Sequence, residues 1–184
     1  PGTRVAGWGV LRAQGRQLHY LGHGVLRMAS QEDAATRLQA LLQGVLQVLD
    51  TYQPAALAIE APFQGKNVQS MLKLGRAQGV CMAAGALRQV PVVEYQPSEV
   101  KKAISGRGGA SKAQVAAMVG RLFPTAPAAL PADATDALAV AVCHAFRSGG
   151  LAAQQPGTAP TRRKGARSSS WADFLKENPD RLKD

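Results

Sequence analysis

The chain has 184 residues, of which 46% are hydrophobic and only 5% aromatic, and its formal net charge at pH 7 is +10. This length suits one α/β domain and a tail, with a core built largely from Ala, Val and Leu. This large net positive charge predicts that the protein binds a polyanion, either a nucleic acid or an anionic membrane surface. No apolar run is long enough to span a bilayer, and the basic segments show no strong amphipathic helix, so the membrane alternative is disfavoured.

The two cysteines, Cys81 and Cys143, each fall in an apolar helical pattern. Neither has a second Cys or a His at ligand spacing, which argues against a cysteine-based metal site. We therefore expect buried, reduced thiols in a cytosolic protein.

The first elements predicted in chain order are a hairpin and a helix. Apolar residues within 5–11 and 18–28 predict two strands, joined by a turn at 13–16. Ser30 with Asp33, close to a capping box, is expected to start a helix, because apolar residues then recur at helical spacing, and Pro54 is expected to end it.

Strands and helices then alternate. The apolar run 55–60 predicts a buried strand, and a helix follows the loop 62–67. A second strand is predicted at 90–95, and two helices at 97–104 and 112–123, the second of them capped by Ser111. This order favours a mixed sheet flanked by helices.

The last core helix is predicted at 132–146, and the composition changes from Ser148 onward to Gly, Ala, Gln, Pro, Ser and Thr. We expect residues 1–147 to form the domain and residues 148–184 a basic, disordered tail. The tail has 7 basic and 4 acidic residues, against 15 and 8 in the rest, so the domain itself carries most of the positive charge.

Three acidic residues adjoin apolar segments. Glu60 ends a predicted strand, and Asp133 and Asp136 share one face of the otherwise apolar last helix. Carboxylates at the border of a buried element are costly unless they are paired or bound to a cation. If the helix packs near Glu60, the three would form an oxygen-rich site suited to Mg²⁺ or Mn²⁺. Two such ions can support phosphodiester hydrolysis.

Simpler interpretations fit the same residues. Asp133 follows a proline and is favourably placed for the helix dipole, and Glu60 is compatible with the exposed end of a strand. Spacing alone leaves both alternatives open.

Four segments resemble, in order, successive blocks of the RuvC Holliday-junction resolvases. They are PGTRVAGWGV, ALAIEAPFQGKNVQSMLKLGRAQGV, PSEVKKAISGRGGASKAQVAAMV and ADATDALAVAVCHAF, and together they span nearly all of residues 1–147. The resemblance implies a ribonuclease-H-like fold, in which a mixed five-stranded sheet has helices on both faces. It also implies a bacterial, cytoplasmic homodimer that uses divalent metal to cut two symmetry-related strands of a four-way DNA junction, with the branch-migration proteins RuvA and RuvB as partners.

The resemblance also assigns site residues. Glu60 corresponds to the strand-end glutamate of the family, and Asp133 and Asp136 to its helical acidic pair, so all three would bind metal, with two ions per subunit. The remaining carboxylate of the family is an Asp directly before the Pro-Gly with which this sequence begins. We expect that Asp, and the central strand that bears it, to precede Pro1 in a longer form, without which the chain would be unstable and poorly active.

Residues expected to contact DNA lie in two loop regions. Phe63 matches the family's aromatic position for stacking at the junction, although a core-anchoring Phe is the simpler interpretation from the residue alone. Gln64, Lys66 and Asn67 are polar loop residues suited to backbone or base contacts, or merely solvated.

Basic residues from a later part of the chain complete the predicted DNA surface. Lys101 and Lys112 match lysines of the family near the active centre, where an ammonium group offsets phosphate charge. Lys102 and Arg107 are expected to extend the same surface. His144, two turns beyond Asp136, is interpreted as a packed helix residue rather than a ligand.

Two rival functions belong to other classes. Pro-Gly-Thr also opens a phosphate-binding hairpin in actin-like ATPases and sugar kinases, but these need a second lobe for which 184 residues leave no room. The other rival is a junction-binding module without cleavage activity. The presence of the three candidate metal ligands, Glu60, Asp133 and Asp136, argues against this rival.

Overall fold

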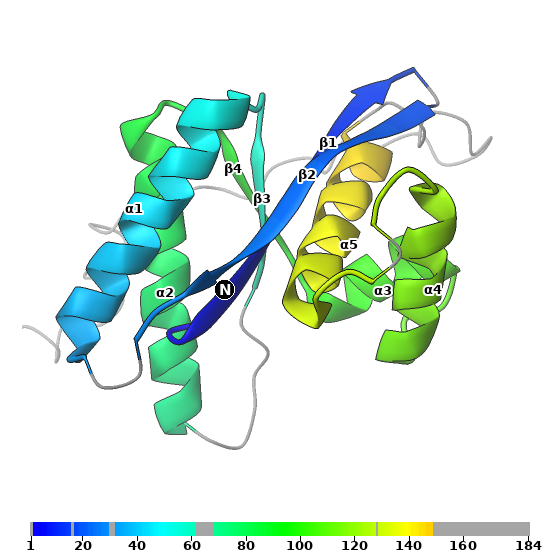
Figure 1. Ribbon diagram of the computed structural model, residues 1–184. Coiled ribbons are helices and arrows are strands. Elements are labelled where there is room, and N and C mark those ends of the chain that lie inside the picture. Colours follow the sequence, from blue (N-terminus) through cyan, green and yellow to red (C-terminus); the bar gives the residue numbers. More distant parts are fainter. Residues whose placement is uncertain (1, 16, 30–31, 62–67, 128, 149–184) are drawn as a thin grey trace, which may run out of the picture. The chain divides into compact units, whose positions relative to one another are not determined.

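The computed structural model describes residues 2–15, 17–29, 32–61, 68–127 and 129–148, all of which lie in one compact unit of the chain (Figure 1). The expected tail, 148–184, lies outside these residues except for Ser148, and so does the loop 62–67. Within the described residues, no helix is long and apolar enough to cross a membrane.

The predicted hairpin is confirmed, with a longer first strand than expected. β1 (Val5–Gln14) pairs antiparallel with β2 (Gln17–Arg27). The register shifts after Val10, which pairs with Gly22, while the next residue of β1 pairs with Tyr20. One residue of β2 is therefore unpaired, and this bulge bends the hairpin.

The predicted end of the first helix is confirmed, but the helix is capped by Asp33 and not by the expected pair of Ser30 with Asp33; Ser30 lies outside the described residues. In α1 (Ala34–Tyr52), the Asp33 side chain accepts hydrogen bonds from the backbone N–H groups of Ala35 and Thr36, at 2.7 and 3.0 Å. These bonds satisfy donors that the first turn leaves without a helical partner. The helix ends at a left-handed Gln53, directly before Pro54.

The second strand pair is parallel. β3 (Leu57–Glu60) and β4 (Val92–Tyr95) are joined through α2 (Val68–Leu87), and Glu60 pairs with Tyr95 at the end of the register. Both strands are shorter than the predicted runs 55–60 and 90–95.

Three helices complete the described fold: α3 (Pro97–Ser105), α4 (Lys112–Leu122) and α5 (Ala132–Arg147). The predicted cap of α4 is confirmed, because Ser111 and Gln114 form a reciprocal capping box.

The expected α/β fold, with helices on both faces of the strands, is confirmed. The described residues contain four strands in two pairs, β1–β2 and β3–β4. One buried cluster joins both pairs to α1 and α2 and includes Ala6, Met28, Leu41, Ile59, Ala77 and Cys81. The other joins both pairs to α3, α4 and α5 and includes Tyr95, Val100, Val119, Leu138, Val142 and Cys143.

Helix α5 packs directly on β1 because two glycines of the strand leave room for it. A Cβ atom added at Gly7 would lie 1.9 Å from the carbonyl oxygen of Asp133, and one at Gly9 would lie 2.6 Å from the Leu138 side chain. This close approach fixes the N-terminal turn of α5, with its acidic residues, against the strand.

Candidate functional site

The three predicted acidic residues are brought to one cavity. Glu60 ends β3, Asp133 lies in the first turn of α5, and Asp136 lies one turn further along; all three line a cavity of about 740 Å³. The helix on which the two aspartates lie is otherwise anchored by buried apolar residues, so its acidic face has a fixed position.

Glu60 is half-buried at the end of its strand. Burial raises the pKa of its carboxyl group, and the nearby Asp136 carboxylate raises it further. Lys112 and Lys101 act in the opposite direction and lower this pKa. The site therefore places two mutually repelling carboxylates beside two ammonium groups.

Lys112, at the first position of α4, pairs directly with an acidic residue. Its Nζ atom donates a hydrogen bond to Asp136 Oδ2 at 3.1 Å, although the Lys112 side chain is 83% exposed. This hydrogen bond is the main cause of the raised pKa of Lys112, to which Glu60 and Asp133 add. The lysine thus faces all three carboxylates at once.

The donor atoms of this cluster suit a hard cation. All three groups are carboxylates, which are the ligands preferred by Mg²⁺ and Mn²⁺, and Glu60 is a buried acid that a cation would stabilise in its charged form. Among the described residues, however, no three His, Cys, Asp or Glu side chains are already close enough to hold a metal ion. The carboxylates converge here, with Lys112 beside Asp136.

The remaining predicted DNA contacts divide into two groups. Lys101 is half-buried on α3 and close enough to influence Glu60, whereas Lys102 and Arg107 are exposed and show no contact with the acidic cluster. The other predicted contacts lie outside the described residues; they are Phe63, Gln64, Lys66 and Asn67.

Sequence reasoning missed a polar network at the other end of α5. The Tyr95 hydroxyl and His144 Nδ1 are hydrogen-bonded at 2.9 Å, which confirms His144 as a packed residue. Arg147 lies over the Tyr95 ring and forms an ion pair with Glu99 at the start of α3. No local spacing indicated this network, because it joins residues almost 50 positions apart.

Both predicted buried thiols, Cys81 and Cys143, are confirmed as free and buried. Burial raises the pKa of each thiol group. Neither therefore behaves as a reactive thiolate.

Comparison with known proteins connects this geometry to one family. Residues 1–144 match the family described as "Crossover junction endodeoxyribonuclease RuvC". The chain is 44% identical over 185 aligned positions to the protein of that name from Cytophaga hutchinsonii, with 100% of this chain and 85% of the relative covered. It is also 44% identical to the protein of the same name from Bacteroides fragilis, with 100% of this chain and 93% of that relative covered.

A solved structure gives the same result. A structure titled "T. thermophilus RuvC in complex with Holliday junction substrate" superimposes with a TM-score of 0.75 at 35% identity, covering 80% of this chain and 90% of that one. The structure titled "Thermus thermophilus RuvC structure" superimposes with a TM-score of 0.73 at 34% identity, covering 80% and 91%. The chain therefore belongs to the RuvC family of crossover junction endodeoxyribonucleases.

Proposed function

We propose that this protein is a structure-selective endonuclease that resolves Holliday junctions in recombination and DNA repair. The observation that carries the proposal is the cavity shared by Glu60, Asp133 and Asp136, with Lys112 paired to Asp136, in a chain of this family. Related proteins bear the name of the activity, and one of them is described in complex with the junction.

The three carboxylates, Glu60, Asp133 and Asp136, are the proposed metal ligands. Two Mg²⁺ or Mn²⁺ ions per subunit, when bound, supply an activated water and stabilise the leaving oxygen of the phosphodiester. Because Glu60 is half-buried, a bound cation would offset the cost of burying its charged carboxylate and would fix its orientation.

Lys112 has a separate role in the proposal. Its ammonium group neutralises Asp136 in the metal-free protein. When Asp136 binds a cation, the exposed and flexible lysine is free to contact the phosphate and to offset the charge that develops during cleavage.

DNA binding is proposed to use the basic residues around this cluster. Lys101, Lys102 and Arg107 are suited to the phosphate backbone, which supplies much of the affinity of DNA-binding proteins. Phe63, Gln64, Lys66 and Asn67 are proposed to contact the junction, with Phe63 stacking on a base.

A homodimer is proposed, in the bacterial cytoplasm, with RuvA and RuvB as further partners. Large apolar side chains on α2 support an interface between two copies: Val68 is 62% exposed, Leu72 53% and Met82 39%. Exposed apolar residues in such number on one helix are typical of a protein–protein contact. Each subunit would then cut one strand, and the twofold symmetry of the dimer would impose paired cuts.

The substitution Asp136→Asn tests the ligand assignment. Cleavage of a synthetic four-way junction is expected to disappear while junction binding is retained, because the variant loses a ligand and no positive charge. Asp50→Asn is the matched control, since Asp50 pairs with Arg88 and lies outside the cluster. Normal cutting by Asp136→Asn would show that the assignment is wrong.

The rival function, a junction-binding module, predicts a different pattern. Wild-type protein would bind the junction but leave it intact at every concentration of Mg²⁺ or Mn²⁺. The same gel assay therefore separates the two functions.

A further inference from the structure

The candidate metal ligands come from two separate elements of the fold. Glu60 lies at the end of β3, whereas Asp133 and Asp136 lie in the first two turns of α5. Among the described residues, these carboxylates are not already close enough together to hold a metal ion. A metal site needs its ligands within about 0.5 Å of the productive geometry. The placement of the end of β3 relative to α5 therefore determines how well the cluster binds a cation.

Tyr95 connects the end of β3 to α5. It is the last residue of β4, directly opposite Glu60, and its carbonyl oxygen accepts a hydrogen bond from the backbone N–H of Ala61 at 2.8 Å. The residue is only 6% exposed, and its hydroxyl group shares a hydrogen bond of 2.9 Å with Nδ1 of His144 on α5. The same residue thus holds the backbone next to Glu60 and, through its side chain, the helix that carries the aspartates.

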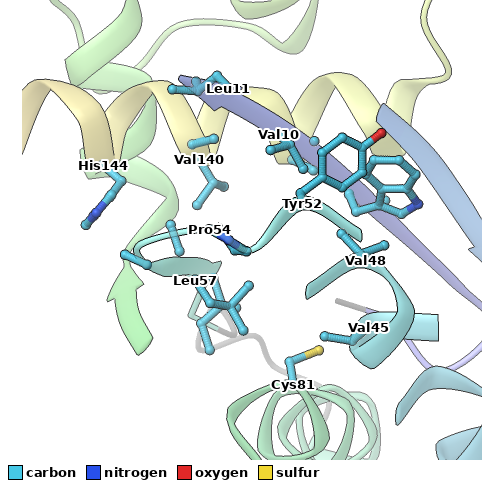
Figure 2. A pocket seen from close by; sticks show the side chains of 18 of the residues that line it. Val10, Leu11, Val45, Val48, Tyr52, Pro54, Leu57, Cys81, Val140 and His144 are labelled. Atoms are coloured by element: carbon cyan, nitrogen blue, oxygen red, sulfur yellow. The ribbon is translucent and has the colours of Figure 1, made fainter. Parts of the chain in front are cut away.

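His144 belongs to the same region of α5 as the acidic cluster. His144 and Val140, one helical turn apart, both line the cavity that contains the three carboxylates (Figure 2). His144 lies about two turns beyond Asp136 on one uninterrupted helix. Because a helix moves as a rigid element, a shift of His144 would displace Asp136 as well.

A second contact of the Tyr95 ring adds α3 to this connection. The guanidinium carbon of Arg147 lies 5.8 Å from the centre of the Tyr95 ring, and Arg147 forms an ion pair with Glu99 in the first turn of α3. The same helix carries Lys101, which is close enough to lower the pKa of Glu60. Tyr95 therefore lies where three elements meet, each of which carries a residue of the site or is paired with one.

We propose that Tyr95 and His144 are positioning residues, whose hydrogen bond sets the placement of Glu60 relative to the aspartates of α5 and thereby the affinity of the cluster for a divalent cation. The inference rests on the proposed function, because it takes these three carboxylates as the ligands. Apolar packing is non-directional and leaves the helix some freedom to slide on the strands. A hydrogen bond between these side chains is directional and restricts that freedom. Neither residue needs to touch the cation or the DNA.

The first test is Tyr95→Phe, which removes the hydroxyl group and keeps the packed ring. Electron paramagnetic resonance measures Mn²⁺ binding to the protein without DNA, and the affinity is expected to fall about 10-fold, as when other groups that orient metal ligands are removed. Tyr20→Phe is the matched control. It also breaks a bond between a tyrosine hydroxyl and a histidine Nδ1, that of His23, but Tyr20 lies outside the residues that line the cavity. Its Mn²⁺ affinity should equal that of the wild type. Wild-type affinity in Tyr95→Phe would overturn the proposal.

Substitutions of His144 separate positioning from a merely structural role. His144→Ala removes the partner of the Tyr95 hydroxyl and is expected to weaken Mn²⁺ binding as much as Tyr95→Phe. His144→Asn is expected to restore the affinity, because its Oδ1 atom is as many bonds from the backbone as Nδ1 and can accept the hydrogen bond. A purely structural role predicts a lower melting temperature and an unchanged Mn²⁺ affinity of the folded protein. Equal weakening in His144→Ala and His144→Asn would contradict the role assigned to the hydrogen bond.

Asp136→Asn, measured in the same binding assay, separates this inference from the proposed function. It removes a proposed ligand and is expected to weaken Mn²⁺ binding more than Tyr95→Phe does. If Asp136→Asn weakens binding and Tyr95→Phe does not, the positioning role is wrong and the ligand assignment stands. If Asp136→Asn binds Mn²⁺ as well as the wild type, the ligand assignment itself is wrong, and the inference falls with it.

Discussion

Lys112 lies where a cation would be expected, beside Asp136 and facing the other two carboxylates. An ion pair this exposed contributes little to stability, about 0–1 kcal/mol. Its position is therefore better explained by a role in the site than by a role in folding.

Substitution of this lysine separates the two roles. Lys112→Ala is expected to lower the cleavage rate by about 10²-fold or more, since one charge that stabilises the transition state is removed, while the melting temperature stays nearly the same. Single-turnover kinetics on a labelled junction measure the effect. Lys102→Ala, an exposed neighbour on α3, is the control and should lose no more than a few-fold. An unchanged rate in Lys112→Ala would remove the lysine from the proposed mechanism.

At the scale of elements, the contact between β1 and α5 positions the aspartates. Gly7→Ala would force a Cβ atom onto the backbone of Asp133, and overpacking of this kind costs about 1–3 kcal/mol. Urea denaturation should show that loss of stability. The control is Gly120→Ala on α4, where nothing lies within 4 Å of the added Cβ. That change should stabilise the helix by about 0.5–1 kcal/mol. If Gly7→Ala were as stable as the wild type, α5 would not pack as closely on β1 as described here.

The other end of α5 is held by the hydrogen bond between Tyr95 and His144. Burial lowers the pKa of His144 below its usual value of 6.5. Because the unfolded chain takes up this proton more readily, the contribution of His144 to stability is complete above pH 6.5 and decreases as the pH falls below it.

The corresponding measurement is the free energy of unfolding between pH 8 and pH 5. His144→Asn should make the profile flatter than that of the wild type below pH 6.5, and His19→Asn, at an exposed position of β2, should not. If the free energy of unfolding of His144→Asn fell with pH as steeply as that of the wild type, this histidine would not contribute to the pH dependence.

At the scale of the whole molecule, local features were predictable and distant contacts were not. Ser111 could be identified as a helix cap because a cap depends on a few neighbouring residues, and the predicted pair of Ser30 with Asp33 gave the right region for the first helix, although Asp33 itself is the cap. The convergence of Glu60 with the α5 aspartates was predicted from an apolar strand end and a three-residue spacing, together with the resemblance of the motifs.

Other features depend on contacts that no spacing contains. The pairing of Lys112 with Asp136 and of Tyr95 with His144 required α4 and β4 to pack on α5. The order of the strands, in the pairs β1–β2 and β3–β4, also depends on nonlocal pairing that no local spacing contains.

The central claim is that the acidic cluster cuts four-way DNA junctions with a divalent cation. The most direct measurement incubates the protein with a synthetic four-way junction and, separately, with a linear duplex of the same sequence. With Mg²⁺ or Mn²⁺, we predict paired, symmetry-related cuts in the junction, none in the duplex, and none in EDTA. A junction that is bound but stays intact across all divalent-ion concentrations would contradict the claim.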